Sequence, residues 1–256
     1  MNEVASIPKK HLPAGKQRTN NDFEKNYLLC RAIEKRIYSD EEVKQLPERF
    51  VNQEHAKEWA IRKRSSQKMY QYLLRQKKVL NILEVGCGNG WFLKTLAGIP
   101  DSLLTGTDIN LAELEQAERV FSANKRLRFM HGDIRSGILG DDLFDIIIFA
   151  ASIPYFSSLN EIITRCFEHL LPGGEIHILD SRFYKPHEIT EAKQRCIQYF
   201  TNQGLPEMAG YYFHHSLSDL APFRYSILYD PESVFHKLSR NRSPFHWVCI
   251  KNENVN

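Results

Sequence analysis

A glycine-rich turn directly after a short apolar run is the feature that most constrains how this chain folds. Residues 79–85 are mainly Val, Leu and Ile, and Gly86, Gly88 and Gly90 follow them. The pattern predicts a buried strand that enters a tight turn and then a helix over residues 91–96. Because glycine has no Cβ, the backbone of such a turn can approach a bound nucleotide closely.

The spacing of the glycines argues against a dinucleotide site. The dinucleotide fingerprint has glycine at the first, third and sixth positions of the turn. Here the sixth position is Trp91, whose bulk would obstruct the approach of a pyrophosphate. The turn therefore favours a different nucleotide ligand.

Acidic residues lie at or shortly after the ends of the next two predicted strands. The strand over 103–107 ends at Asp108, 18 residues after Gly90, where an acidic side chain of a βαβ unit accepts hydrogen bonds from ribose hydroxyls. Asn110 and Glu113 then form a predicted capping box for a helix over 111–121. A third strand over 127–130 leads to Asp133, and a fourth over 144–149 is apolar enough to be covered on both faces.

Together these segments resemble motifs of the class I S-adenosylmethionine-dependent methyltransferases over roughly residues 79–251. Residues 84–90 are similar to the acidic strand end and Gly-x-Gly-x-Gly turn of that family, residues 132–134 to its Gly-Asp-x segment, and residues 170–174 to its "LLPGG" turn. The resemblance implies an α/β fold: a seven-stranded, doubly wound, Rossmann-like methyltransferase sheet. We expect it to be mostly parallel with one antiparallel strand, and to carry a helical cap.

The resemblance also implies that S-adenosyl-L-methionine is the cofactor and S-adenosyl-L-homocysteine the product. Glu84 would order the turn and attract the cofactor's ammonium, Asp108 would bind ribose, and Asp133 the adenine amino group. Cys87 has no neighbouring base in sequence, so we interpret it as a small filler of the turn. The expected cofactor-binding residues are Glu84, Gly86, Cys87, Gly88, Asn89, Gly90, Asp108, Ile109, Asp133, Ile134 and Ala150.

Length and composition exclude several classes of protein. The chain has 256 residues, contains no 18-residue apolar stretch and has no apolar segment near its start, so we expect neither a membrane span nor a secretory signal. Five scattered cysteines without a Cys-x-x-Cys pair argue against a disulfide framework and a structural zinc site. We therefore expect a cytoplasmic protein without a metal; the sequence does not set its oligomeric state.

Two appendages to the predicted sheet differ from it in character. Residues 1–78 are interpreted as a tail (1–21) and a basic helical cap, with helices over 23–38 and 54–78 and a break at Pro47. The methyltransferase domain would span 79–251 with a cap insertion at 181–222, which includes a helix over about 186–200, and residues 252–256 would be a tail. A sixth strand over 223–229, a helix start at residues 230–231 and a last strand over 245–250 complete the prediction.

The charge of the chain is uneven. Residues 1–78 contain 18 Lys and Arg against 10 Asp and Glu, a net charge of +8, and the remainder has 16 against 21, a net charge of −5. A basic arm can bind nucleic acid, but acidic residues are interleaved with the basic ones, so we favour a solvated helical face.

The acceptor side gives weaker signals. Tyr211, Tyr212, His214 and His215 suggest a general base among aromatic side chains, and neighbouring strand positions would let only one His reach the site. A His that acts as the base should lower turnover about 100-fold or more when changed to Gln. Residues 152–155 resemble the polar-x-Pro-aromatic quartet of amino-methylating enzymes, displaced by two positions, so Tyr155 is interpreted as a pocket wall. His214, His215 and Tyr155 are thus the candidate catalytic residues.

The sequence is consistent with three functions. The preferred hypothesis is methyl transfer from S-adenosylmethionine to a small organic acceptor. An RNA or protein N-methyltransferase is favoured by the basic first 78 residues and by Pro154 and Tyr155, but the displaced quartet and the lack of a recognisable RNA-binding module oppose it. A non-catalytic S-adenosylmethionine-binding module is the third, since binding residues can outlast the loss of chemistry.

Overall fold

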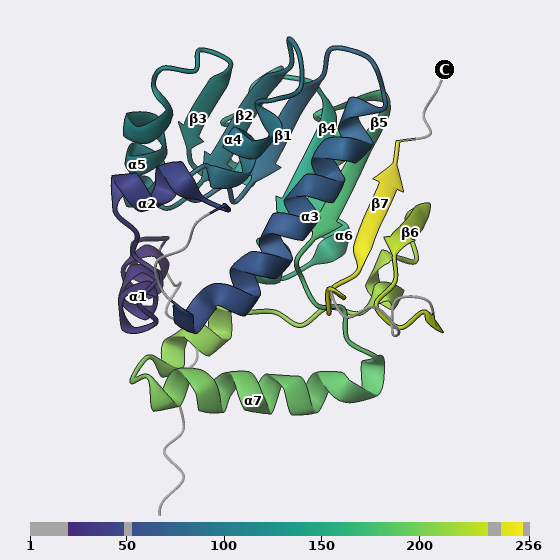
Figure 1. Ribbon diagram of the computed structural model, residues 1–256. Coiled ribbons are helices and arrows are strands. Elements are labelled where there is room, and N and C mark those ends of the chain that lie inside the picture. Colours follow the sequence, from purple (N-terminus) through teal and green to yellow (C-terminus); the bar gives the residue numbers. More distant parts are fainter. Residues whose placement is uncertain (1–19, 49–52, 235–241, 253–256) are drawn as a thin grey trace, which may run out of the picture.

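The computed structural model describes residues 20–48, 53–234 and 242–252 (Figure 1). Most of the two predicted tails, and most of the helix expected after residues 230–231, fall outside these ranges. No helix in the described ranges is both long and apolar enough to cross a membrane.

A seven-stranded sheet forms the centre of the molecule, in the order β3-β2-β1-β4-β5-β7-β6. The pairs from β3 to β5 are parallel, and β7 is antiparallel to both of its neighbours, which confirms the predicted sheet. The order reverses between β1 and β4, and ligands of such sheets bind in the crevice at this point, outside the carboxyl ends of the strands. The strands are β1 (Asn81–Val85), β2 (Leu103–Asp108), β3 (Leu127–His131), β4 (Phe144–Ala150), β5 (Leu170–Leu179), β6 (Tyr225–Tyr229) and β7 (Trp247–Lys251).

Helices cover both faces of the sheet, which explains the apolar β4. Along β4, Ile146 and Ile148 pack into one buried cluster, and Ile147 and Phe149 pack into another on the opposite face. The first cluster lies under α3 (Ala56–Leu74), α4 (Trp91–Leu96) and α5 (Leu111–Phe121), and the second under α6 (Leu159–Phe167).

The two appendages meet beyond the carboxyl ends of the parallel strands (Figure 1). The N-terminal one contains α1 (Asn20–Ile33) and α2 (Asp40–Gln45) in addition to α3, and the second contains α7 (Ile189–Asn202) and a 3-10 helix, η5 (Pro206–Tyr211). Buried side chains of α1 and of the second appendage form a third apolar cluster. Its buried members are Cys30, Phe200, Leu205 and Met208.

Several predicted boundaries were wrong by a few residues. The helix expected over 23–38 ends at Ile33, because Lys35 adopts a left-handed backbone with φ 55° and the Ser39 capping box starts α2. The "LLPGG" segment, expected as a turn, lies within β5, where the pairing with β4 is irregular. The last two strands begin two residues later than expected.

A buried polar cluster lies between α3 and the strands β5 and β7. The indole Nε1 of Trp247 donates a hydrogen bond to His177 Nδ1 at 3.1 Å, so this nitrogen carries no proton, and His177 Nε2 donates to Glu175 at 3.2 Å. Burial lowers the pKa of His177 although Glu175 opposes the shift. Glu175, His177 and Cys249 have ligand atoms within 4.8 Å of one another, but the protonated Nε2 of His177 faces its partners and cannot bind a metal in this tautomer.

Replacing Trp247 with Phe should destabilise the fold, because it leaves the buried His177 Nδ1 without a donor. We expect the free energy of unfolding to fall by about 1–3 kcal/mol in urea titrations at pH 7. Ile227→Val, at a residue 40% exposed on β6, is the matched control and should change it by less than about 0.5 kcal/mol. Equal stability of W247F and wild type would contradict this account of the cluster.

Candidate functional site

A cavity of about 350 Å³ lies over the carboxyl ends of β1, β2 and β4. The glycine turn forms its floor, and its walls include side chains of α1, α3 and α5 together with Tyr211 and Phe213. The sheet and both appendages thus contribute to one site. Its volume lies in the range of about 300–1,000 Å³ that is usual for small-molecule sites.

The glycine turn is held against the end of β2. The amides of Gly86 and Cys87 donate to Thr107 O at 2.8 and 3.0 Å, and the amide of Gly88 donates to an Asp108 carboxylate oxygen at 2.7 Å. A Cβ on Gly86, which has φ +75°, would lie 2.5 Å from the Cβ of Ser152. Only glycine fits this position, and the turn presents bare backbone to the cavity.

Glu84 supplies an unsatisfied carboxylate at the floor of the cavity. The residue is 2% exposed, and its Oε2 atom has no hydrogen-bond partner among the described residues. Burial and the nearby charge of Asp108 raise the pKa of Glu84 well above its ordinary value, and Arg62 opposes this shift. Asn89 Oδ1 is likewise buried without a partner. Both oxygens can accept hydrogen bonds from donors of a ligand.

Asp108 and Asp133 place two further carboxylates along the cavity. The second oxygen of Asp108 accepts from the amide of Asn110 at 2.8 Å, and burial raises the pKa of this carboxyl. Asp133 caps the 3-10 helix η2 (Ile134–Ser136), and its carboxylate accepts from Arg135 Nη2 at 2.6 Å. A carboxylate has about four acceptor sites, so Asp108 keeps capacity for a ligand. Both oxygens of Asp133 already accept from the main-chain amide and the guanidinium of Arg135, so a ligand there would compete with Arg135.

The structure brings ten of the eleven predicted cofactor-binding residues to the cavity. The exception is Gly90, which is the N-cap of α4 and faces Phe129, 2.8 Å from where its Cβ would be. Cys87 is buried, and burial raises the pKa of its thiol, as fits a filler of the turn. The residues that line the cavity are Glu84, Gly86, Cys87, Gly88, Asn89, Asp108, Ile109, Asp133, Ile134 and Ala150.

Of the three residues expected on the acceptor side, Tyr155 lines the cavity and the two histidines do not. His214 packs against the rings of Tyr184 and Tyr212, with centroids 5.2 and 5.5 Å away. His215 is 6% exposed and its Nε2 donates to Phe156 O at 2.9 Å. The geometry thus gives no support for a histidine base.

Tyr211 and Phe213 line the cavity in place of the histidines. Ser152 is also occupied: its hydroxyl donates to Val85 O at 2.5 Å and braces the end of β1. The polar residue of the predicted quartet therefore holds backbone together instead of gripping a planar amine.

Glu113 is a site residue that the sequence pattern assigned to another role. Asn110 caps α5 by accepting from the Glu113 amide at 3.1 Å, but the Glu113 carboxylate lines the cavity instead of completing a capping box. Its Oε1 lies 4.0 Å from Arg31 Nε, and burial raises its pKa to about 7. An Asn-x-x-Glu pattern fits both roles, so only the packing of α1 over α5 distinguishes them.

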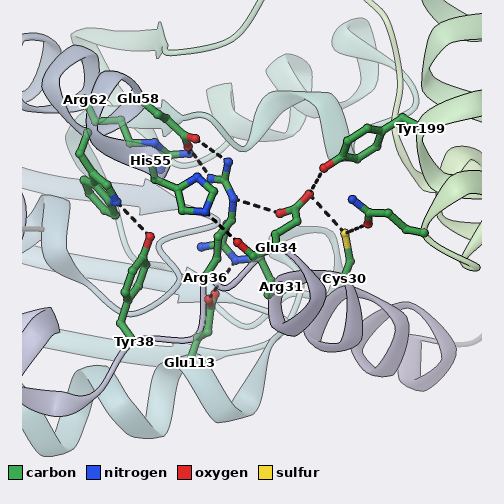
Figure 2. A network of polar contacts seen from close by, with 12 residues as sticks. Cys30, Arg31, Glu34, Arg36, Tyr38, His55, Glu58, Arg62, Glu113 and Tyr199 are labelled. Carbon is green, nitrogen blue, oxygen red and sulfur yellow. Dashed lines mark hydrogen bonds and ion pairs between the residues drawn. The ribbon is translucent and has the colours of Figure 1, made fainter. Parts of the chain in front are cut away.

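A network of charged groups behind the cavity ties the appendages together (Figure 2). Arg36 donates two hydrogen bonds to Glu58 at 2.6 and 2.5 Å, and Glu58 also pairs with Arg62 at 2.9 Å. Burial alone would raise the pKa of Glu58, but the hydrogen bonds and charges of these arginines lower it to about 2. Arg36 Nε pairs with Glu34 at 3.0 Å, and Glu34 accepts a hydrogen bond from Tyr199 of α7.

Comparison with known proteins links residues 82–174 to the family described as "Methyltransferase domain". Malonyl-acyl-carrier protein O-methyltransferase of Priestia megaterium is 28% identical over 138 residues, which are 51% of this chain and 49% of the relative. Ribosomal RNA small subunit methyltransferase C of Haemophilus influenzae is 26% identical over 151 residues, 54% of this chain and 42% of the relative. The chain thus spans about half or less of the length of these curated relatives.

A solved structure similar over most of the chain is the plantazolicin methyltransferase BpumL, determined with a pentazolic desmethyl analogue and SAH. Its TM-score is 0.54 at 18% sequence identity, and the match covers 91% of this chain and 98% of that one. At this identity the likeness establishes the shared fold, including the parts outside residues 82–174.

Replacing Glu113 with Gln should change how stability depends on pH. The pKa of Glu113 in the fold is about 7 against an ordinary value of 4.5, so its protonated form contributes stability below pH 4.5 that is lost as the pH rises through 7. Relative to wild type, E113Q should therefore gain up to about 3 kcal/mol in free energy of unfolding between pH 4.5 and pH 8. Urea titrations across this range measure the difference.

Glu115→Gln, at an exposed position of the same helix, is the control and should follow the wild-type profile. Parallel profiles of E113Q and wild type would show that Glu113 titrates as an ordinary exposed carboxyl.

Proposed function

We propose that the chain is a class I S-adenosylmethionine-dependent methyltransferase and that it transfers a methyl group from S-adenosylmethionine to a small organic acceptor. The observation that carries the proposal is the single cavity in which the glycine turn and the unsatisfied Glu84 face aromatic side chains of both appendages. The floor of the cavity, at the glycine turn, suits the methyl donor S-adenosylmethionine, and the aromatic wall suits a methyl acceptor.

The residues at the floor of the cavity fit the cofactor. S-adenosylmethionine supplies, when bound, a methyl group already activated by a sulfonium. The unpartnered Oε2 of Glu84 suits its ammonium, and the bare backbone at Gly86 and Gly88 leaves room for its chain. Asp108 would accept from the ribose hydroxyls and Asp133 from the adenine amino group, with Ile109 and Ile134 against the adenosine and Ala150 beside the methionine part.

The opposite wall of the cavity suits a flat or apolar acceptor. The rings of Phe23 and Tyr27 pack edge-on against Tyr155, with centroids 5.7 and 5.8 Å away, and Phe23 lies 5.0 Å from Tyr211. Displacement at an activated carbon requires mainly that donor and acceptor are held in line and that water is kept out. These rings come from three separate segments and would supply both.

Transfer to RNA is less well supported by the described residues. Three basic side chains in the described part of the N-terminal cap are paired with acids: Lys35 with Glu54, Lys63 with Glu48, and Arg36 with Glu58. The hydroxyl of Ser152 donates to Val85 O, so the polar residue of the polar-x-Pro-aromatic quartet is engaged with backbone and does not face a planar amine.

Two further expectations stay predictions. One is the division into an N-terminal cap at 1–78, a methyltransferase domain at 79–251 and a cap insertion at 181–222. A cytoplasmic location agrees with five cysteines that are all free, since disulfides form mainly in oxidising compartments.

The choice of acceptor class is tested with labelled S-adenosylmethionine. We expect the purified chain to transfer the labelled methyl to a component of a small-molecule extract, and not to RNA or protein fractions of the same cells. Transfer to RNA that weakens steeply with salt would instead favour the RNA hypothesis, because phosphate contacts are salt-sensitive. A chain that binds S-adenosylmethionine and labels no fraction would favour a non-catalytic module.

The acceptor wall is tested by Tyr155→Ala against His214→Gln. Once an acceptor is known, Y155A should lower kcat/KM for it about 10-fold, because a ring that lines the cavity is lost. H214Q should stay within about threefold of wild type, since His214 does not line the cavity, and proton transfer by a base is typically worth at least about 100-fold. A loss of that size in H214Q would restore the histidine base.

A further inference from the structure

A positively charged side chain ends the aromatic wall that α1 contributes to the cavity. Phe23, Tyr27 and Arg31 follow one another at steps of four residues, so they share one face of the helix, and all three line the cavity. The rings of Phe23 and Tyr27 stack with centroids 5.7 Å apart, and the guanidinium carbon of Arg31 lies over Tyr27, 5.7 Å from its centroid. The wall that we propose to hold the acceptor therefore has an apolar end and a cationic end.

Arg31 differs in its partners from the other two arginines that line the cavity. Arg62 pairs with Glu58 at 2.9 Å, and Arg135 donates to Asp133 at 2.6 Å. The side chain of Arg31 is 18% exposed, yet its Nε is buried without a hydrogen-bond partner among the described residues. A buried charged group is stable only when it is paired, so this guanidinium suits an anionic ligand.

The acid that faces Arg31 is a weak counter-ion. Glu113 Oε1 lies 4.0 Å from Arg31 Nε, which is beyond hydrogen-bond distance (Figure 2). Burial raises the pKa of Glu113 to about 7 although the charge of Arg31 opposes the shift, so roughly half of these carboxyls are protonated near neutral pH. A protonated carboxyl is a hydrogen-bond donor, and an anion beside Arg31 would accept from both groups.

The pair of Arg31 and Glu113 lies beside the glycine turn. Glu113 Oε2 is 2.9 Å from the place that a Cβ of Gly88 would take, so the absence of a side chain there leaves room for the carboxyl. An anion bound at Arg31 would thus lie next to the turn that we propose to hold the methyl donor. An acceptor anchored in this way has its ring against Tyr27 and its reacting end near the donor.

We propose that Arg31 determines the specificity of the acceptor site, and that the acceptor is a flat molecule with a carboxylate, which Arg31 binds while the ring packs against Phe23 and Tyr27. The inference rests on the proposed function and names the class of acceptor. The planar fork of a guanidinium matches the two oxygens of a carboxylate. One cation with an acid beside it favours a single negative charge over the two of a phosphate, because the second charge would be repelled by ionised Glu113.

The test compares naphthoate, a flat carboxylate, with naphthamide, which has nearly the same shape without the charge. In calorimetric titrations of the full chain with the donor site filled by S-adenosylhomocysteine, wild type should bind naphthoate at least about 10-fold more tightly than naphthamide. Arg31→Met should abolish this preference and leave the affinities for naphthamide and S-adenosylhomocysteine within about threefold of wild type. Arg31→Lys, which keeps the charge without the fork, should keep part of the preference.

Lys25→Met is the matched control. It also removes one positive charge from α1, but at an exposed position that does not line the cavity. K25M should prefer naphthoate as strongly as wild type does, because a solvent-exposed charge is screened by salt. An equal loss of preference in K25M and R31M would show that the net charge of α1, and not a contact of Arg31, attracts the carboxylate.

Wild type that binds S-adenosylhomocysteine but binds the two probes equally, or neither of them, would overturn the inference. A folded R31M that still prefers naphthoate would also overturn it, and so would one that loses affinity for S-adenosylhomocysteine instead, since Arg31 would then belong to the donor site. The urea unfolding midpoint reports whether R31M is folded; if it is not, a wild-type preference in R31K contradicts the proposal. Wild type that does not bind S-adenosylhomocysteine would contradict the proposed function itself.

Discussion

The attachment of the glycine turn to the end of β2 is the constraint on which the site depends. Three consecutive amides, those of Gly86, Cys87 and Gly88, are fixed by acceptors of Thr107 and Asp108 alone. The other oxygen of Asp108 accepts a hydrogen bond from the amide of Asn110, which is the N-cap of α5. One carboxylate therefore positions both the glycine turn and the start of the next helix. A side chain on the turn would break this arrangement, because Ser152 fills the space beside Gly86.

The two halves of the cavity have different physical origins. Parallel strands and their tight turns build the half that we propose to bind the cofactor, where bare backbone and strand-end carboxylates face the cavity. The other half is built by segments that come together only in the folded chain, and a partly buried network of charged groups joins them. Hydrogen bonds and charges of its arginine partners lower the pKa of Glu58 against the opposing effect of burial. Variation in the appendages could therefore change the acceptor while leaving the donor site intact.

The sheet and the cofactor half could be predicted from sequence because their signals are local. The apolar run before Gly86 and the position of Asp108 at the next strand end are properties of a βαβ unit, and the structure confirms the sheet that they predict. The missed α2 also had a local signal, the capping box of Ser39 and Glu42.

The acceptor half depended on contacts that sequence spacing does not reveal. The local Asn-x-x-Glu pattern predicted a capping role for Glu113, whereas its contact with Arg31, 82 positions earlier in the chain, cannot be read from local spacing. His214 looked like a base because of its chemistry, but the packing of Tyr184 and Tyr212 around it decides its position. Arg62 belongs to a basic helix, and its ion pair with Glu58 and its packing over Trp59 accompany its place at the cavity.

The most direct test of the central claim is a calorimetric titration of the folded wild-type chain with S-adenosylhomocysteine, the product form of the cofactor. A cavity built on the glycine turn should give one binding site per chain with a dissociation constant in about the micromolar range. A folded chain that shows no saturable binding at millimolar ligand would contradict the claim that this turn is a cofactor site.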